Sequence, residues 1–526
     1  MTRRTFLLAA PLARAVSTPA GILDPEQFRH HVEFFNRMVP EDPVTTIPNA
    51  EAWAWMKSNI PFFTCPDADV ERTYYYRWWT YRKAIKRTPS GFIITEFLKP
   101  VQHAGEYNAL SCAFGHHVAE GRWLKTTSYL DEYARFWLCG GDNGGIRKNF
   151  HQFSGWAAAA LYDRWLADGR MQALTSMLDS LLLDYRAWER ERMADSGLFW
   201  QRDVSDGMEE SISGGRHVRN LRPSINSYMY GNARAIASIA GLAGRRDAAS
   251  EYRDKAVRLR RQIQTRLWNP QDRFFETVLE SGTFAGVREE IGFTPWCFHV
   301  PEADRGFEIA WQQLMDPQGF YAPFGPTTAE QRNPGFKIAY EGDDCQWNGP
   351  SWPFATTITL RALANVLNGY HQNVITRQDY FETFEIYTRS HRLKLPGGRV
   401  IPWIDENLNP RTGEWLARAM KIRKGTFYGR GDHYNHSCYC DLVITGVAGL
   451  RPRPDEVIEV NPLVPAGKWE WFCLDGAPYH GRRLSIVWDP TGRRFGRGRG
   501  LAVFADGVEI ARAPDLRRVT GKLPPA

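Results

Sequence analysis

The chain has 526 residues, of which 43% are hydrophobic and 24% charged, the balance of an ordinary globular protein with a large core. Its formal net charge is +7, but arginines gather near the two ends, whereas the aromatic-rich motifs carry both signs of charge. A nucleic-acid binder is expected to interleave basic and aromatic residues along one face, so this distribution argues against nucleic acid as the partner. The 13% aromatic content, including 20 Trp, suits a ligand with flat apolar faces such as a sugar ring, although bases also stack on aromatics.

The first residues, MTRRTFLLAAPLARA, resemble an export signal. A twin-arginine pair precedes a short apolar stretch, and Ala13-Arg14-Ala15 fits a small-x-small cleavage site. This pattern predicts a leader over residues 1–20 and a periplasmic or secreted protein. Pro11 interrupts the apolar stretch, which leaves a cytoplasmic start open. No later segment reaches the about 18 uninterrupted apolar residues of a membrane span, so no membrane partner is expected.

The rest of the chain divides by its hydrophobic period. Residues 21–105 mix short helical and extended pieces, and residues 106–450 are repeatedly helical. Helices are predicted over 126–138, 153–168, 171–193, 227–243, 246–267, 351–368, 376–391 and 436–449. Long Gly/Pro/aromatic loops separate them, and loops of that length in a compact domain are usually functional. We therefore predict a mainly α catalytic domain over 21–453, a closed helical toroid with its site at one end.

After residue 453 the period falls to two. Val457–Val460, Leu484–Trp488 and Leu501–Phe504 alternate as strands do. A small β-domain over 454–526 is predicted to close the chain. The Gly496–Gly500 run of glycine and arginine is too short for a dinucleotide fingerprint and is interpreted as a turn between strands.

An aromatic run over 74–81 precedes the helical part. Tyr76, Arg77, Trp78 and Trp79 could form a sugar-binding platform, with the arginine contacting hydroxyl or carboxylate groups. A core aromatic cluster is an equally good interpretation.

Two loops carry acids in glycine- and aromatic-rich surroundings. The first, SDGMEESISGGR over 205–216, places Asp206, Glu209 and Glu210 within five residues. Crowded carboxylates raise one another's pKa, and a general acid working at neutral pH needs a raised pKa. A solvated acidic loop is the alternative interpretation.

The second loop, PWIDENLNPRTGE over 402–414, sets Asp405 and Glu406 between a tryptophan and an Asn-Pro turn. Glycoside hydrolysis needs one acid to protonate the leaving oxygen. An inverting enzyme needs a second carboxylate, roughly 6.5–9.5 Å away, to activate water. Two acids from distant loops fit this requirement, and a capped turn between helices is the alternative.

These motifs resemble those of glycoside hydrolase family 63 and mannosylglycerate hydrolases. GMEES at 207–211 is similar to the G-[ML]-D-N-S segment with the general acid of that clan, and DENLNPRTGE at 405–414 to its W-E-N-Y-[ND]-P-x-T-G-E segment with the general base. WNGPSWP at 347–353 resembles the W-x-G-P-x-W motif whose tryptophans line the sugar site. The string over 434–453 looks like the final barrel helix, and the resemblance covers roughly residues 70–460.

The resemblance implies an (α/α)₆ barrel and an inverting glycosidase that works without a cofactor. It places Glu209 on the acid and Glu406 on the base. Glutamate replaces the usual aspartate at 209, and Glu210 replaces an asparagine, so both stay candidates for the acid. Asp405 competes with Glu406 as the base. The resemblance also implies a sugar-lining role for Gln346, Trp347 and Trp352, and Arg216 follows the acid closely enough to contact a hydroxyl or an acidic substituent.

Other interpretations stay open. A polysaccharide lyase or a sugar epimerase can use the same toroid, and a sugar-binding protein can keep the tryptophans without catalysis. The string HYNHSCYC over 433–440 superficially resembles a zinc site, but its ligands crowd together with no distant pair, so no metal is predicted. His116 and His117 are expected on a core-facing helix, and the eight scattered cysteines are expected to act as small buried hydrophobes without required disulfides. The sequence carries no signal for the oligomeric state.

Overall fold

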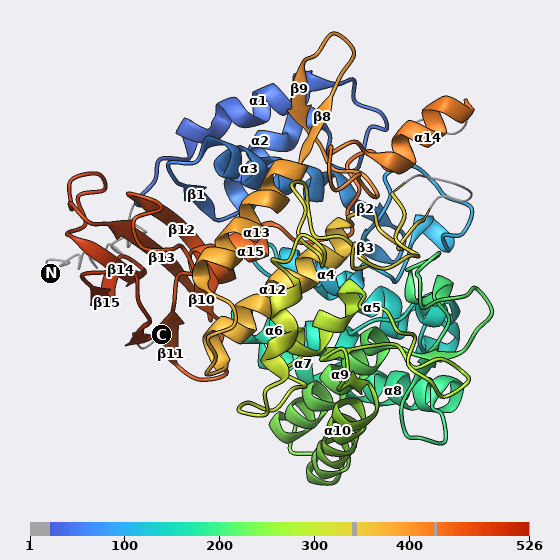
Figure 1. Ribbon diagram of the computed structural model, residues 1–526. Coiled ribbons are helices and arrows are strands. Elements are labelled where there is room, and N and C mark those ends of the chain that lie inside the picture. Colours follow the sequence, from blue (N-terminus) through green and yellow to red (C-terminus); the bar gives the residue numbers. More distant parts are fainter. Residues whose placement is uncertain (1–20, 339–344, 426–428, 525–526) are drawn as a thin grey trace, which may run out of the picture.

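The computed structural model describes residues 21–338, 345–425 and 429–524, and the predicted leader over 1–20 lies outside them. Helices dominate as far as residue 447, and a β-structure closes the chain (Figure 1). The prediction of a mostly helical protein with a small C-terminal sheet is confirmed. Among the described residues, no helix is both long enough and apolar enough to span a bilayer.

The helical part is built from α-helices of very unequal length. They are α1 (Arg29–Met38), α2 (Ala52–Asn59), α3 (Ala68–Ala84), α4 (Phe114–Gly121), α5 (Ser128–Cys139), α6 (Ala157–Asp168), α7 (Met171–Thr175), α8 (Leu178–Arg192), α9 (Pro223–Leu242), α10 (Arg246–Arg266), α11 (Thr294–Cys297), α12 (Pro353–Gly369), α13 (Arg377–Ser390), α14 (Leu416–Lys424) and α15 (Cys440–Leu442). Most predicted helices match these within a few residues. The predicted helix over 171–193 is instead broken into α7 and α8, and the one over 436–449 begins only at Cys440 and continues as a π-turn over Val443–Val447.

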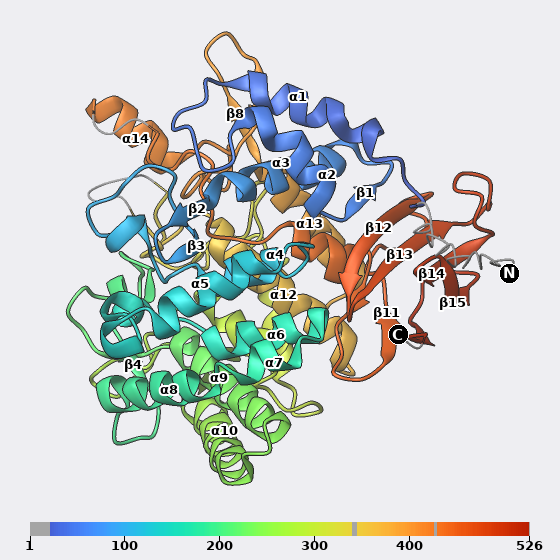
Figure 2. The same ribbon diagram turned by 180° about the vertical axis from the view of Figure 1, so that it is seen from behind.

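Contacts between these helices form a closed series. It runs through α3, α15, α4, α6, α9, α11, α12 and α13, and α13 returns to contact α3. α5, α8 and α10 lie outside this series, and Figure 2 shows them toward the outer side of the molecule. The loops that precede α9, α12 and α15 therefore lead into helices of this one series.

Helix α3 corrects the prediction of short mixed pieces before residue 105. Asp67 caps it by accepting hydrogen bonds from the N–H groups of Asp69 and Val70. Nearly every residue from Thr73 onward is buried, because α1, α2, α13 and α15 all pack against it. A helix buried on all sides has no polar face, so its 3.6-residue period is hidden in the sequence.

The aromatic run lies on α3 and belongs to the core, so the sugar-platform interpretation is corrected. Trp78 and Trp79 are 0% and 1% exposed. Arg77 donates to the Tyr387 hydroxyl, the His391 ring and the Ser437 carbonyl oxygen, at 3.3, 3.1 and 2.7 Å. Tyr76 contacts the His433 ring through its hydroxyl, 2.8 Å from Nδ1. None of the four side chains is available to a ligand in this arrangement.

The C-terminal β-structure consists of two antiparallel sheets. One is five-stranded, in the order β1 (Phe62–Thr64), β12 (Phe472–Tyr479), β13 (Arg482–Asp489), β14 (Gly500–Ala505) and β15 (Val508–Ala513). The other contains β10 (Leu450–Arg451), β11 (Val457–Val460) and β16 (Val519–Lys522). Short two-stranded pairs elsewhere are β2 (Ile85–Thr88) with β3 (Gly91–Ile94), β4 (Trp200–Gln201) with β5 (Asn220–Leu221), β6 (Trp268–Asn269) with β7 (Phe274–Phe275), and β8 (Arg392–Lys394) with β9 (Val400–Pro402).

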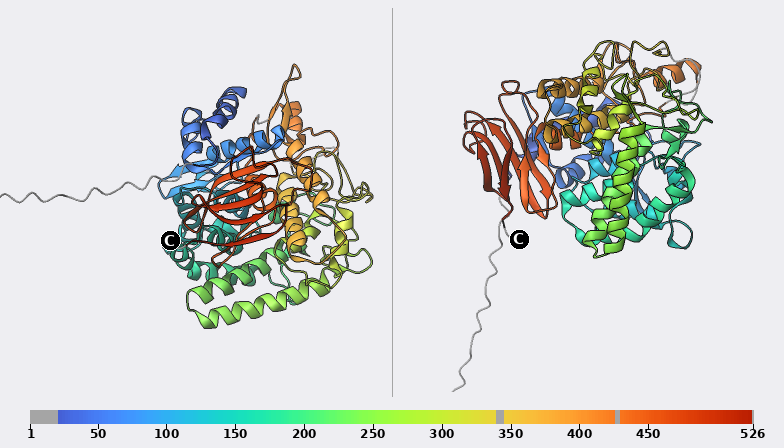
Figure 3. Two further views of the ribbon diagram at one scale, coloured as in Figure 1. Left: turned by 90° about the vertical axis from the view of Figure 1, so that its left-hand side faces the viewer. Right: turned by 60° about the horizontal axis from the view of Figure 1, so that its bottom comes forward.

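The larger sheet recruits a strand from the start of the chain. Strand β1 pairs with β12, with Phe62 opposite Asp475, and the Leu23 N–H donates to the Asp475 carboxylate at 3.0 Å. Figure 3 shows the sheet against the helical part. The predicted domain boundary at 453/454 stays a prediction, but a residue-based cut there would separate β1 from its own sheet.

Candidate active site

Three segments identified in the sequence meet where α9 and α12 begin. The Trp347 N–H donates to the Glu209 carbonyl oxygen at 3.1 Å, which joins the first acidic loop to the tryptophan motif. Ser351 and Leu408 exchange two backbone hydrogen bonds of 3.0 Å, which joins that motif to the second acidic loop. Residues separated by about 200 positions are thus assembled through the backbone of the segment 347–351.

Glu209 is half-buried at this junction. Burial raises the pKa of its carboxyl to about 7, the Arg216 guanidinium lowers it, and the charges of Asp203 and Glu406 raise it further. Glu406 contributes least of these causes, and the two loops are joined chiefly by the backbone bridge through 347–351. A carboxyl with this pKa is protonated in an appreciable fraction of molecules at neutral pH.

Glu210, in contrast, is exposed. It has a φ of 58°, in the left-handed region. The carboxylate is 45% exposed and accepts a 3.3 Å hydrogen bond from Arg216 Nε. Of the two candidates for the acid, the geometry favours Glu209.

Asp206 does not lie in the cluster of carboxylates that the sequence suggested. It is buried and accepts hydrogen bonds from Arg222 Nε, at 2.9 Å, and from the Ser224 hydroxyl. This ion pair anchors the loop to the start of α9. Burial, rather than crowding by Asp206 and Glu210, is therefore the main cause of the raised pKa of Glu209.

The tryptophan motif forms a stacked pair. The rings of Trp347 and Trp352 lie 4.7 Å apart and 12° from parallel, and each residue is 3% exposed. Trp352 Nε1 donates to the Gln346 carbonyl oxygen at 2.7 Å. Trp347 Nε1 and Asn348 Oδ1 are buried without a hydrogen-bond partner among the described residues, so two polar atoms of the motif remain for a ligand or water. The pair packs at the junction of the two acidic loops.

The second acidic loop is a tight turn built around Asn409. The Asn409 side chain accepts from the N–H groups of Arg411 and Thr412, and its main chain bonds Gly413 and Glu414. Gly413 has a φ of 76°, which glycine adopts without strain. The predicted Asn-Pro turn is present, and it holds the preceding residues in place.

Glu406 lies in a buried ion pair. Its Oε1 contacts Lys421 Nζ at 2.7 Å and Arg430 Nε at 3.3 Å, and the residue is 1% exposed. Oε2 is held more loosely, with Arg430 as its 3.5 Å donor. Two cations compensate a negative charge at this position, and Oε2 is the oxygen with the weaker contacts among the described residues.

Asp405 is directed elsewhere. Its Oδ1 accepts from the Glu406 N–H at 2.9 Å, and its Oδ2 lies 3.6 Å from Arg418 and 3.4 Å from Trp403 Nε1. Burial, followed by the charges of Glu406 and Asp432, raises the pKa of Asp405 to about 7. These contacts fit a residue that shapes the loop, and they favour Glu406 as the base.

A third acid, Glu96, was missed in the sequence. It follows β3, is 5% exposed, and accepts a short hydrogen bond from the Tyr434 hydroxyl. Burial raises its pKa to about 7, Tyr434 lowers it, and the charge of Glu406 raises it. Its second oxygen, Oε2, has no hydrogen-bond partner among the described residues. The only sequence signal was one acid in an otherwise apolar strand end.

Two further side chains complete the surroundings. The pKa of Cys345 is raised well above its usual range by burial and by the charges of Glu209 and Glu406, so this thiol lies near both acids. His436 is 2% exposed, neither ring nitrogen has a hydrogen-bond partner among the described residues, and its ring lies 3.8 Å from that of Tyr434 and 6.0 Å from that of Trp352. The Glu96 carboxyl, the His436 ring and the Cys345 thiol are therefore polar groups of the site that can form hydrogen bonds with a hydroxyl-rich ligand or with water.

The histidines and cysteines of the segment 433–440 contact different parts of the protein and do not meet at one point. The His433 ring contacts Tyr76, and Cys438 approaches the buried His116. Among residues 21–338, 345–425 and 429–524, no group of three or more potential metal-ligating side chains occurs. All eight cysteines are free, and four of them are buried.

Comparison with known proteins agrees with the class of site that this geometry defines, a carbohydrate-processing one. Residues 106–437 match the model of the mannosylglycerate hydrolase MGH1-like glycoside hydrolase domain, and residues 450–511 match the C-terminal domain of glycosyl hydrolase family 65. The chain therefore belongs to the MGH1-like family of glycoside hydrolases, a family of glycosidases.

Solved structures give the fold context. A protein named sialidase is 45% identical with a TM-score of 0.90; the match covers 95% of this chain and 45% of that one, so this chain spans less than half of it. A family 78 rhamnosidase of Bacillus sp. GL1 is 12% identical with a TM-score of 0.56, covering 82% of this chain and 40% of that one. The family 63 mannosylglycerate hydrolase from Thermus thermophilus, in complex with Tris, is 13% identical with a TM-score of 0.50, covering 71% and 100%. The last two similarities concern the fold alone.

Proposed function

We propose that this protein is an inverting glycosidase built on an (α/α)₆ barrel, with Glu209 as the general acid and Glu406 as the general base. The closed series of helix contacts supports the barrel, since the loop of Glu209 and the tryptophan motif lead into α9 and α12, two helices of that series. One observation carries the assignment: the loop of the half-buried Glu209, whose pKa is raised by burial, is joined through the backbone of 347–351 to the loop of a second carboxylate, Glu406, compensated by two cations.

In the proposed mechanism, protonated Glu209 donates its proton to the glycosidic oxygen as the bond to the sugar breaks. Glu406 Oε2 accepts a proton from a water molecule that attacks the opposite face of the ring. The two groups begin in different charge states because burial favours the neutral form of Glu209, whereas Lys421 and Arg430 compensate the charge of Glu406.

The substrate is proposed to be an oligosaccharide or glycoside whose ring lies against Trp347 and Trp352. Glu96 and His436 offer hydrogen-bonding atoms on the remaining sides. The names of the similar proteins include mannosylglycerate hydrolase, rhamnosidase and sialidase, so the substrate panel includes mannosides, rhamnosides and sialosides. Export through a twin-arginine signal remains a proposal that rests on residues 1–20 alone.

Leaving-group dependence tests the two roles separately. Glu209→Gln is expected to lose about 10²–10⁴-fold in kcat on an alkyl glycoside, a range typical of general acid catalysis, and to keep most activity on a dinitrophenyl glycoside that needs no protonation. Glu406→Gln is expected to lose a similar factor on both substrates, because neither supplies a base. NMR of the first product formed is expected to show inversion at the anomeric carbon.

Glu210→Gln is the matched control, and its activity is expected to stay within a few-fold of wild type. Equal loss by Glu209→Gln on both leaving groups would remove it as the acid. Retention of configuration would remove the single-displacement mechanism. An unsaturated product absorbing in the ultraviolet would identify a lyase.

A further inference from the structure

A cavity lies among the helices, away from the candidate active site. It has a volume of about 280 Å³ and is bordered mainly by the later turns of α6, α9 and α12 and by β10. The candidate active site lies where α9 and α12 begin, roughly two or three helical turns away. No residue proposed above to act in catalysis or sugar binding lines this cavity.

Two of its four arginines are neutralised by acids. Arg122 NH2 contacts the Asp441 carboxylate at 2.7 Å, and Arg361 NH2 contacts the Asp163 carboxylate at 3.0 Å. Asp163 and Asp441 are the only carboxylates in the described lining of the cavity. Each of the two acids therefore forms an ion pair with one arginine, and neither is in direct contact with Arg234 or Arg451.

Arg234 and Arg451 have neutral partners. Arg234 NH1 donates to the Phe298 carbonyl oxygen at 3.1 Å, and Arg451 NH2 donates to the Asn365 side-chain oxygen at 3.0 Å. Within the described part of the chain, no carboxylate lies within 4.0 Å of either guanidinium. Each guanidinium therefore has no carboxylate in direct contact and keeps N–H donors beyond the one hydrogen bond given above, and Arg234, which also lies 5.7 Å from the Tyr230 ring centroid, is exposed to solvent.

One acid near Arg451 needs separate mention. Glu459 stands opposite Arg451 in the β10–β11 pair. Its carboxylate contacts Arg453 at 2.9 Å and Arg518 at 3.4 Å. This acid is shared with two other arginines, so its charge, which acts on Arg451 from a distance, compensates that guanidinium only in part.

The surroundings extend the positive charge. A neighbouring hollow of about 740 Å³ shares Arg234 and is lined by four more arginines and one acid, Glu302. Burial and the charges of Arg234 and Arg451 lower the pKa of His299, which lines the first cavity. A neutral imidazole there can donate a hydrogen bond without adding to the repulsion.

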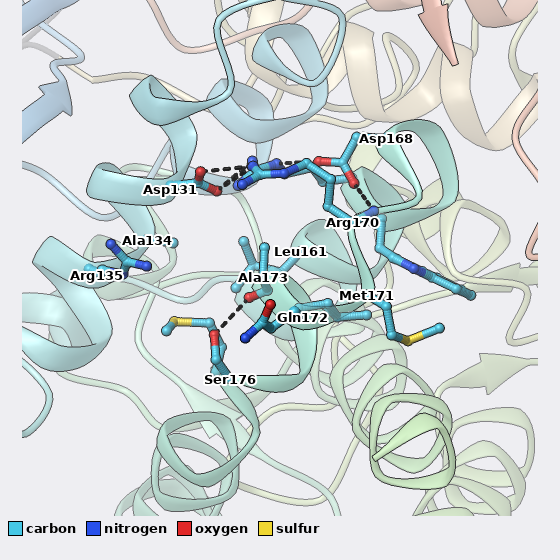
Figure 4. A pocket seen from close by; sticks show the side chains of 14 residues that line it. Asp131, Ala134, Arg135, Leu161, Asp168, Arg170, Met171, Gln172, Ala173 and Ser176 are labelled. Atoms are coloured by element: carbon cyan, nitrogen blue, oxygen red, sulfur yellow. Dashed lines mark hydrogen bonds and ion pairs between the residues drawn. The ribbon is translucent and has the colours of Figure 1, made fainter. Parts of the chain in front are cut away.

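A third cavity, between α5, α6 and α7, shows the contrasting case (Figure 4). Arg164 contacts Asp131 at 2.6 Å and Asp168 at 3.0 Å, and Arg170 contacts Asp131 at 2.8 Å. Arg164 and Arg170 are paired with acids of the protein, and among the described lining of this cavity Arg135 is the one arginine without a carboxylate in direct contact.

We propose that the cavity between Arg234 and Arg451 binds a small oxyanion with two negative charges, of the phosphate or sulfate type. Guanidinium groups bind such oxygens through paired, charge-assisted hydrogen bonds, and here no protein carboxylate competes for them. The volume exceeds that of a phosphate group, so the ligand is either free phosphate or a phosphate carried by a small molecule such as a sugar.

Calorimetric titration of the full chain with sodium phosphate tests this, with sodium chloride of equal ionic strength as the reference. Saturable binding with phosphate and none with chloride is expected. Arg234→Gln and Arg451→Gln are each expected to weaken binding about tenfold or more, since a charge-assisted hydrogen bond contributes about 1.5–3 kcal/mol. Glucose 6-phosphate forms a second arm: tighter binding than phosphate identifies a carried phosphate, and equal or weaker binding identifies the free ion.

Arg497→Gln is the control, because Arg497 is an exposed arginine in the turn before β14. Arg451→Gln could fold poorly because it loses the contact with Asn365, so Arg451→Lys is a second variant. Lysine keeps the positive charge but not the paired N–H donors of the guanidinium, and Arg451→Lys is expected to bind phosphate with intermediate affinity. Phosphate binding no stronger than the chloride reference, or equal affinity in Arg234→Gln and Arg497→Gln, would overturn the proposal.

Discussion

Glu209 and Glu210 are neighbours in the sequence, yet their surroundings give them different chemistry. Glu210 has a left-handed φ and an exposed side chain, while Glu209 lies half-buried at the junction of three segments. The sequence could place an acid in this loop, but it could not choose between two adjacent glutamates. That choice depends on one backbone dihedral and on the burial supplied by residues about 140 positions later.

The raised pKa of Glu209 predicts the alkaline limb of the activity profile. Glu209 must be protonated to act, so kcat/KM is expected to fall as the pH rises through about 7. Arg216 lowers this pKa, so Arg216→Gln is expected to move the limb to higher pH. The shift should be roughly a few tenths of a pH unit, because Arg216 is 41% exposed and water screens its charge.

A pH–rate series with wild type, Arg216→Gln and Arg219→Gln measures this shift. Arg219 is an exposed arginine of the same loop that stacks on Trp200, and its variant should leave the limb in place. A limb that moves to lower pH in Arg216→Gln contradicts the assignment of Glu209.

Glu96 shows what residue-level sequence reasoning misses. Its partner Tyr434 lies 338 positions away, and no spacing motif joins the two. The residue is recognisable only when the strand end and the loop before α15 are seen together. Conversely, the tryptophans of α3 have the composition of a sugar platform, and only their packing reveals them as core.

The buried carboxyl of Glu96 predicts a pH-dependent stability. Its folded-state pKa is raised from 4.5 to about 7, so its contribution to the free energy of unfolding is fully present below about 4.5 and is lost as the pH rises through 7. Glu96→Gln does not ionise. Its stability relative to wild type is therefore expected to improve between pH 5 and pH 8, by at most on the order of 3 kcal/mol.

Denaturant unfolding of both proteins at the two pH values checks this, with the exposed Glu33→Gln as reference. If the difference between Glu96→Gln and wild type were the same at pH 5 and pH 8, Glu96 would not titrate between them.

At the scale of elements, the long amphipathic helices were predictable and the short or fully buried ones were not. α9, α10, α12 and α13 carry an apolar face at helical spacing, and their predicted bounds differ from the observed ones by a few residues. β1 has only three residues and is a strand because it pairs with β12, far away in the sequence. Most of the segment 433–439 is buried and bonded as a loop, so the predicted final helix starts late.

The second acidic loop depends on one close approach by a glycine. A Cβ at Gly431 would lie well inside van der Waals contact with Asp405 Oδ1, and near Glu406 Cγ. Gly431→Ala is therefore expected to displace the base and to destabilise the fold by about 1–3 kcal/mol, a typical cost of overpacking. Turnover should fall together with the free energy of unfolding.

Gly241→Ala is the matched control for this substitution. Gly241 lies in α9 with no atom within 4 Å of an added Cβ, so alanine there should be neutral or stabilising by about 0.5–1 kcal/mol through helix propensity. Full activity in Gly431→Ala would show that the loop can yield without moving Glu406.

At the scale of the whole molecule, the chain closes on itself. β1, from residues 62–64, is an edge of the sheet that the last part of the chain builds, and Phe63 packs its ring 5.5 Å from Tyr74 of α3 and 6.4 Å from Trp469. The helical part and the sheet thus share one strand and one continuous set of buried side chains. This joint could not be foreseen from a hydrophobic period that changes at residue 453.

Because the two parts share β1, loss of Phe63 is expected to weaken both of them. Phe63 is 0% exposed, and Phe63→Ala should cost about 3–5 kcal/mol in the free energy of unfolding. Hydrogen exchange should rise in β12–β14 and in α3 together, since each loses a packing partner.

Val508→Ala, at a 59% exposed position on edge strand β15, should change stability by less than about 0.5 kcal/mol and leave both regions protected. Faster exchange confined to the sheet after Phe63→Ala would mean that the C-terminal part folds independently, and the 453/454 boundary would then describe two separable units.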